Sequence, residues 1–209
     1  METPYDLLDI EHWDRREAFR FFRGFDEPFF NICTTVDISG LMEIARSNEL
    51  PASLMILWQA IRAANRVEAF RLRLHGDEVR RYHCIKPACT MRRGENGFFF
   101  SYLNYEAGMT AEEFILQGRQ AIESQQSVSG LGARPDALDV VHCSILPWTS
   151  FTGLKHARHS AYPDSIPKFV FGKFYEASGK ILLPVGIDLH HALADGWHAA
   201  QFLEQMEWK

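Results

Sequence analysis

The sequence has no long apolar run, no excess of basic residues and no cysteine-pairing motif. No run reaches the roughly 18 apolar residues of a membrane-spanning helix, so none is expected. The 22 Lys and Arg against 27 Asp and Glu give a net charge of −5, which argues against a nucleic-acid-binding surface. The four cysteines show no CxxC spacing: Cys33, Cys84, Cys89 and Cys143.

The first residues, METPYDLLDIEHW, are acidic and aromatic, which is unlike the basic and then apolar pattern of a signal peptide. Cysteines in a chain of this length without a secretory signal are expected to be reduced. Together these features predict a cytoplasmic protein without a metal or a disulfide framework.

The composition is that of an ordinary globular protein. The chain has 209 residues, 46% of them hydrophobic and 23% charged, and it contains no repeat, low-complexity tract or linker. A single domain over residues 1–209 is the simplest interpretation, and its length is sufficient to bury a core. The 16 phenylalanines are numerous enough to suggest an aromatic core or an apolar pocket.

The pattern of apolar residues switches between helical and strand periodicity. Helices are expected over 15–23, from a cap at Asp37 to about Asn48, over 52–66, from a Thr110–Glu113 capping box to about Gln126, and from about Gly196 to Glu207. Strands are expected at 29–36, in a hairpin turning at Gly76-Asp77, on both sides of Gly94–Gly97, over 139–151 with an interruption at Pro147, and in a hairpin turning at Ser178-Gly179. This mixture predicts an α+β two-layer sandwich, a large mixed β-sheet with helices packed on it.

The sharpest motif is HHALADG, residues 190–196, between the last expected strand and the last expected helix. Neutral imidazole has an ordinary pKa near 6.5, so a histidine at a strand end can accept a proton from a hydroxyl at neutral pH. Asp195 is placed to orient the ring or to organise the turn, and Gly196 allows the tight reversal into the helix.

Three other interpretations of this motif remain open. Asp195 is also a good N-cap for the last helix. One of the two adjacent histidines is expected to be structural, because neighbouring strand residues point to opposite faces. A metal site formed by His191, Asp195 and His198 is the least favoured, because the strand-to-helix junction disrupts the i, i+4 spacing of a helical zinc motif.

Four segments in order resemble the chloramphenicol acetyltransferase family, whose signature is HHxxxDG. They are IEHWDRREAF, SILPWTSF, FGKFYEASGKILLPVGIDLHH and HHALADGWHAAQF, and the resemblance extends from about Asp9 to Phe202. It implies an acetyl-CoA-dependent O-acetyltransferase that works by direct transfer in a ternary complex, with no acyl-enzyme. The absence of a nucleophile-elbow motif agrees with this.

The resemblance also assigns roles to individual residues. It implies that His191 is the general base and that Ser144 donates a hydrogen bond to the oxyanion of the tetrahedral intermediate. It implies that Asp195 pairs with Arg15 in a buried salt bridge that shapes the site. Lys173 matches a family lysine near the 3′-phosphate of CoA.

The family is a homotrimer with active sites between subunits. The resemblance therefore implies that His191 comes from one subunit and much of the acceptor pocket from its neighbour. The matching pocket positions are Phe21, Phe22, Phe98, Leu154 and Val170, although any single phenylalanine is more often plain core.

Three departures from the family concern its ligands. The family has a second CoA-binding lysine at a position that falls near Asn48 and Glu49 here. Val170 stands where the family has a threonine, and His156 stands where it has an apolar pocket residue. The expected acceptor is chloramphenicol, and the alternatives are another hydroxyl or thiol acceptor, as in the dihydrolipoamide acyltransferases, or a non-catalytic protein that binds the drug.

Overall fold

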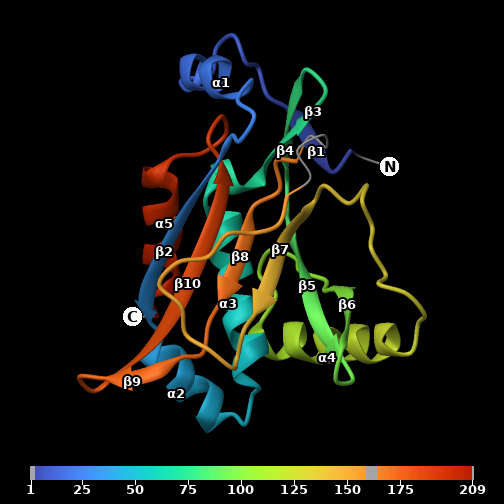
Figure 1. Ribbon diagram of the computed structural model, residues 1–209, viewed down its shortest axis with the longest axis vertical. Helices are drawn as coiled ribbons and strands as arrows, with labels where there is room; N and C mark the ends of the chain where they lie inside the picture. The colour runs from blue at the N-terminus through green and yellow to red at the C-terminus, as the bar shows by residue number, and fades with distance from the viewer. Residues whose placement is uncertain (1–2, 159–163, 209) are drawn as a thin grey trace.

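The computed structural model describes residues 3–158 and 164–208, which form a mixed sheet with helices on one face (Figure 1). The sheet has seven strands. In spatial order they are β2 (Phe29–Asp37), β10 (Lys180–His190), β8 (Lys168–Phe171), β7 (Val140–Ile145), β5 (Lys86–Arg93) and β6 (Gly97–Tyr102), with β9 (Tyr175–Ala177) paired to the start of β10.

The helices that cover the sheet are α2 (Ser39–Ser47), α3 (Ala52–Arg66), α4 (Ala111–Gln126) and α5 (Gly196–Met206). A separate helix, α1 (Arg16–Phe22), lies beyond the end of β10 (Figure 1). Next to it is a three-stranded sheet of β1 (Tyr5–Leu7), β4 (Glu78–Tyr82) and β3 (Leu72–His75). The short helix η1 (Glu68–Arg71) comes directly before β3 in the chain. Within residues 3–158 and 164–208, no helix is long and apolar enough to cross a membrane.

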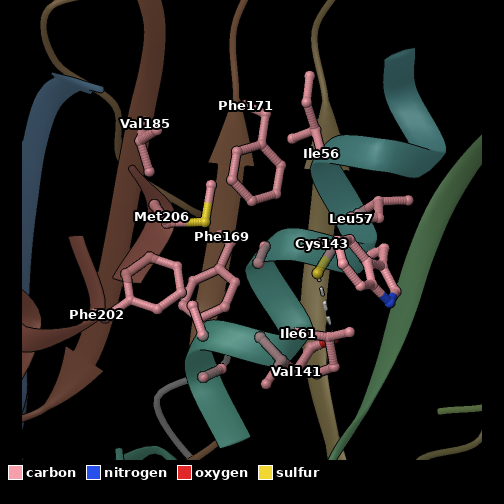
Figure 2. Packing of buried hydrophobic residues seen from close by; sticks show 14 of the residues in the cluster. Ile56, Leu57, Ile61, Val141, Cys143, Phe169, Phe171, Val185, Phe202 and Met206 are labelled. Atoms are coloured by element: carbon pink, nitrogen blue, oxygen red, sulfur yellow. Dashed lines mark hydrogen bonds between the residues drawn. The ribbon is translucent and has the colours of Figure 1, made fainter. Parts of the chain in front are cut away.

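Alternation along the strands divides the large sheet into two faces. In β8, Phe169 and Phe171 point to the helices, where they meet Phe202 and Met206 of α5 (Figure 2). Each is at most 1% exposed, and burying a side chain of this size contributes about 1.5–3 kcal/mol. The intervening residues of each strand point to the face that carries no helix.

Residues on the face without helices line up across the central strands. In β7, Ser144 lies beside Val170 of β8, and Val170 lies beside Gly186 of β10. Two residues earlier, His142 lies beside Lys168, which lies beside Asp188. Polar side chains therefore gather on the sheet surface that includes Ser144.

The predicted α+β sheet-and-helix architecture is confirmed. The capping box of α4 is present, because the Glu113 N–H donates to Thr110 Oγ1 at 3.2 Å and the Thr110 N–H donates to Glu113 Oε2 at 2.9 Å. Several boundaries shift by one residue, and two differences concern a predicted break and a predicted cap. The strand expected over 139–151 ends at Ile145, before Pro147, and α2 begins after Ile38, with Asp37 accepting the Ser39 N–H at 3.0 Å.

A fully buried arginine ties the small sheet to the large one. Arg73 of β3 is 0% exposed and donates to the carbonyl oxygens of Phe70, Leu72, Leu138 and Val140 at 2.5–2.8 Å. Burial lowers the pKa of its guanidinium to about 10, so it stays charged at neutral pH. The last two carbonyls fix the start of β7, the strand that carries Ser144.

Replacing this arginine should therefore destabilise the protein severely. Arg73→Leu leaves four carbonyl oxygens without their donor and should lower the free energy of unfolding by about 2–4 kcal/mol, measured by urea denaturation. Arg20→Leu is the matched control, because Arg20 makes only an exposed pair with Glu11 and should cost under about 1 kcal/mol. Equal effects of the two variants would contradict the role given to Arg73.

Candidate active site

His191 sits on the turn between β10 and α5, held by its backbone and by its ring. Its N–H donates to the Pro28 carbonyl at 2.7 Å, and its ring stacks on Phe22 with centroids 3.9 Å apart. The Nδ1 atom lies 3.2 Å from the Ala194 carbonyl oxygen. A carbonyl can only accept, so the neutral ring carries its proton on Nδ1 and leaves the Nε2 lone pair available as a base.

His190 is the buried member of the pair. It is 4% exposed, packs edge-on against Phe29, and accepts the Ala192 N–H at Nδ1 over 3.2 Å. Burial lowers its pKa to about 4, so it stays neutral. This agrees with the expectation that only one histidine is available for chemistry, since neighbouring residues at a strand end face opposite ways.

Asp195 combines the two roles weighed for it. Its Oδ1 caps α5 by accepting the N–H groups of Trp197 and His198, and Oδ1 also lies 2.7 Å from His198 Nδ1. Its Oδ2 pairs with Arg15, whose Nη2 donates to the His191 carbonyl at 3.3 Å. Burial raises the pKa of Asp195, but His198 and Arg15 outweigh that effect, so the pKa is lowered.

The salt bridge between Arg15 and Asp195 was expected to be buried, but within one chain it is only partly buried. The Arg15 side chain is 18% exposed and that of Asp195 is 34% exposed. The metal interpretation gains no support, because His198 contacts Asp195 while the His191 ring turns to Ala194. Within residues 3–158 and 164–208, no group of three His, Cys, Asp or Glu side chains is arranged to hold a metal ion.

Ser144 lies in the wall of a cavity of about 580 Å³ on the sheet face without helices. One side of this cavity is aromatic, with Phe98, Phe100 and Tyr102 of β6. The opposite side is polar, with His142, Lys168, Arg158 and Asp164 among its residues. Ser144 is half-buried between them, so its hydroxyl is positioned to meet a bound molecule.

Ser144 and His191 are far apart within one chain. Ser144 of β7 is level with Gly186 of β10, which lies two strands away across the sheet. His191 comes five residues after Gly186 along the chain. With strands about 4.8 Å apart and a rise of about 3.3 Å per residue, their Cα atoms are about 19 Å apart. Single-chain geometry therefore does not bring the predicted base and the predicted oxyanion donor together.

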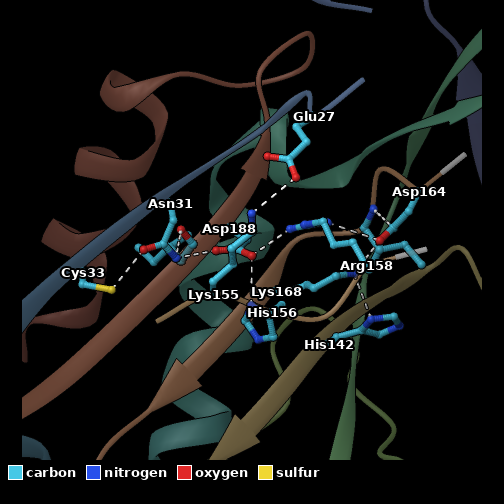
Figure 3. A network of polar contacts seen from close by, with 12 residues as sticks. Glu27, Asn31, Cys33, His142, Lys155, His156, Arg158, Asp164, Lys168 and Asp188 are labelled. Carbon is cyan, nitrogen blue, oxygen red and sulfur yellow. Dashed lines mark hydrogen bonds and ion pairs between the residues drawn. The ribbon is translucent and has the colours of Figure 1, made fainter. Parts of the chain in front are cut away.

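Sequence reasoning missed a charged cluster beside Ser144 (Figure 3). Lys168 is 7% exposed, and its Nζ lies 2.6 Å from Asp164 Oδ2 and 3.4 Å from His142 Nδ1. Asp188 is 3% exposed and accepts from Arg158 Nη2 at 2.7 Å. Buried charges of this kind are rare unless paired, but their positions, spread from 142 to 188, form no recognisable motif.

These charged groups perturb one another. Burial raises the pKa of Asp164, but Lys168 outweighs it and lowers that pKa. Burial lowers the pKa of Lys168, although Asp164 opposes the shift. The pKa of His142 is lowered to about 4. The larger cause is that neighbouring protein atoms keep water from the ring, which disfavours its charged form, and the smaller cause is the positive charge of Lys168. His156 Nδ1 lies 2.9 Å from Asp188 Oδ2, so its ring belongs to the same cluster.

The residues predicted for the acceptor wall lie in three places. Phe98 borders the Ser144 cavity, and Val170 is adjacent to Ser144 but 1% exposed. Leu154 lines a neighbouring hollow with Asp188. Phe21 and Phe22 were expected in the acceptor pocket, and Phe22 stacks on His191 of its own chain because α1 lies beyond the end of β10.

The predicted CoA residue, Lys173, is exposed just after β8. Its N–H donates to the Thr149 carbonyl at 2.8 Å, next to Trp148, which is 63% exposed. Asn48 and Glu49 lie where α2 ends, and Glu49 has a φ of 52°. Residues 48–51 contain no lysine that could supply the second CoA contact.

Comparison with known proteins agrees with the fold and with the family resemblance. A sequence profile described as "Chloramphenicol acetyltransferase" matches residues 3–207. The chain belongs to this family. A chloramphenicol acetyltransferase of Campylobacter coli is 30% identical over 206 residues, covering 97% of both proteins. Chloramphenicol acetyltransferase 2 of Escherichia coli is 27% identical, covering 97% of this chain and 95% of that protein. As a member of the chloramphenicol acetyltransferase family, the protein is an acyltransferase.

Solved structures extend the comparison to the fold. A chloramphenicol acetyltransferase structure matches with a TM-score of 0.85 and 26% identity, covering 97% of this chain and 98% of that one. The cubic core of the pyruvate dehydrogenase multienzyme complex matches with a TM-score of 0.69 and 15% identity, covering 99% and 89%. The second likeness concerns the fold alone, which the chloramphenicol acetyltransferase family shares with that core.

Substitutions of Asp195 should separate its two roles. Asp195→Asn keeps a good N-cap but loses the pair with Arg15, and should cost about 1–2 kcal/mol of unfolding free energy because that pair is only partly exposed. Asp195→Ala also loses the cap and should cost about 1 kcal/mol more. Asp77→Asn is the control, since its pair with Arg23 has a 99% exposed carboxylate. An Asp195→Asn variant as stable as the wild type would contradict the ion-pair role.

The deficit of Asp195→Asn should also depend on pH. Folding lowers the pKa of Asp195, so its contribution is present above the unfolded-state pKa near 3.9 and is lost as the pH falls through the folded-state value. Urea denaturation should show the full deficit at pH 7 and a shrinking one below about pH 4. A deficit that is constant across this range would mean that the charge of Asp195 contributes nothing.

Proposed function

We propose that the protein transfers the acetyl group of acetyl-CoA to an acceptor hydroxyl by direct attack in a ternary complex, and that chloramphenicol is among its acceptors. The observation that carries this proposal is the His191 ring, whose Nδ1 faces the Ala194 carbonyl while Nε2 is left as a proton acceptor at the end of a rigid strand. Membership of the chloramphenicol acetyltransferase family supports the reaction and the acceptor.

In the proposed reaction, His191 Nε2 removes the proton of the acceptor hydroxyl as that oxygen attacks the thioester carbonyl. The carbonyl oxygen becomes an oxyanion, and the Ser144 hydroxyl donates a hydrogen bond to it. Collapse of the tetrahedral intermediate expels the CoA thiolate, which takes the proton from the imidazolium. Asp195 and Arg15 position the turn that carries His191 and take no part in the proton transfer.

We further propose that the working enzyme is a homotrimer whose sites form between subunits. The argument is the separation of about 19 Å between Ser144 and His191 along and across the sheet of one chain. A second copy that faces the sheet surface without helices would present its His191 to this chain's Ser144. Exposed aromatic side chains beside His191 suit such an interface, since Phe21 is 66% exposed and Trp197 is 68% exposed.

Lys173 is the proposed contact for the CoA phosphate, with the exposed Trp148 close to it in the chain's fold. Because acetyl-CoA is an intracellular metabolite, the same proposal implies a cytoplasmic enzyme. A protein that only binds a drug would need no base held in one tautomer. Release of free CoA from acetyl-CoA in the presence of an acceptor distinguishes the enzyme from such a binding protein.

Removing the proposed base should abolish most turnover. His191→Ala should lower kcat by about 10²–10⁴, measured as CoA release, because the acceptor hydroxyl loses its general base. His190→Ala serves as the comparison, since that ring is buried against Phe29 and should affect stability more than chemistry. A larger kcat loss for His190→Ala than for His191→Ala would reverse the assignment.

Removing the proposed oxyanion donor should act on the transition state. Ser144→Ala should lower kcat by about 10²–10³ with little change in KM, because the hydrogen bond forms fully only to the developing negative charge. Ser150→Ala is a suitable control on the exposed loop after β7. A change confined to KM would place Ser144 in ground-state binding instead.

Mixed trimers should test the shared site directly. Inactive His191→Ala and Ser144→Ala chains, co-expressed in equal amounts, should regain about a quarter of the wild-type activity if each site takes one residue from each of two neighbours. Sedimentation should show a trimer in every case. Mixed trimers that stay inactive, or a stable active monomer, would show that each chain holds a complete site.

A further inference from the structure

The side chains that line the Ser144 cavity include more cations than carboxylates. The cationic side chains that line it are Lys168, Arg158 and Arg134, and the carboxylate that lines it is Asp164. Asp188 lies behind Arg158 and pairs with it at 2.7 Å. Even when Asp188 is counted, the cations around the whole cavity outnumber the carboxylates by three to two, because Arg134 lies over the Tyr102 ring on the aromatic side.

Stability alone does not account for this cluster. Charges taken out of water are costly, and a buried ion pair is often no more stable than apolar residues of the same volume. The other face of the same strands is apolar, with Phe169 and Phe171 on either side of Val170. Charges are therefore concentrated on the wall that a bound molecule would touch, which points to a role in binding.

The register fixes where the cluster lies relative to the reacting centre. Lys168 lies on the strand next to Ser144 and two residues along it, so their Cα atoms are about 8 Å apart. His142 lies directly beside Lys168 and is two residues before Ser144 on the same strand. A molecule with its hydroxyl near Ser144 can place a second group against the Lys168 ammonium while its apolar part contacts Phe98 and Phe100.

We infer that the preferred acceptor is a hydroxylated carboxylic acid whose carboxylate is held by Lys168 and Arg158. A single excess positive charge matches a monoanionic carboxylate better than a dianionic phosphate. A neutral, largely apolar acceptor such as chloramphenicol would displace water from these charged side chains without offering hydrogen bonds in its place. It should therefore be the slower substrate. This inference rests on the proposed acetyl transfer for its chemistry and goes beyond it in the class of acceptor.

A matched pair of probes tests the charge preference. The probes are 4-(hydroxymethyl)benzoate and its methyl ester, which share the hydroxyl and the ring and differ in charge. With the intact protein and acetyl-CoA, kcat/KM should be at least about tenfold higher for the carboxylate, as expected for charge-assisted hydrogen bonds. A ratio near one in the wild type would overturn the inference.

Two substitutions should move that ratio in opposite directions. Lys168→Met removes a cation and should lower the carboxylate-to-ester ratio at least about tenfold, whereas Asp164→Asn removes the competing carboxylate and should raise it. Lys180→Met is the matched control, because it breaks a lysine–aspartate pair of 3.0 Å with Asp37 at the other end of β10 and should leave the ratio unchanged. Lys168→Met combined with Asp164→Asn leaves no unpaired charge and covers the case in which Lys168→Met fails to fold.

Binding measured by calorimetry without acetyl-CoA separates this inference from the proposed function. If no acceptor releases CoA but the carboxylate still binds more tightly than the ester, and Lys168→Met removes that preference, the transferase proposal fails and the carboxylate site stands. If chloramphenicol and both probes are acetylated with ratios that neither substitution changes, the transferase proposal stands. The cluster is then a structural ion network, and the inference is wrong.

Discussion

The carboxylate of Asp195 is the interaction on which the rest of the site depends. One of its oxygens caps α5, and the other pairs with Arg15, which in turn donates to the backbone of His191. The same group therefore fixes where the helix starts, where α1 approaches, and how the turn presents the histidine. This explains how one aspartate can have a structural role and also position the proposed base.

The second constraint is that the sheet has only one face covered by helices. Period-two alternation sends Ser144, Lys168 and Asp188 to the opposite face, which no helix covers. That surface holds a cavity, and its register keeps Ser144 about 19 Å from His191. In the proposed trimer the uncovered face becomes the place where two chains complete one site.

The cavity beside Ser144 combines an aromatic wall with a charged one. The aromatic wall suits the ring of an acceptor, and Lys168 and Arg158 suit a carboxylate. The proposed reaction uses the base, the oxyanion donor and the CoA contact, and none of these belongs to the charged wall. The charged cluster is where this chain's specificity is expected to be set.

The sequence by itself determined the helices, most strand boundaries, the capping box at Thr110 and the HHxxxDG turn, because these depend on local periodicity and on caps within a few residues. It also pointed to His191, Asp195 and Arg15 through a resemblance carried by short motifs. Only the tertiary structure decided that Asp195 caps and pairs at once, and that Phe22 stacks on its own chain's histidine. The charged cluster likewise exists only in three dimensions, because strand register gathers side chains from His142 to Asp188 into one network of pairs, and no spacing in a sequence encodes those pairs.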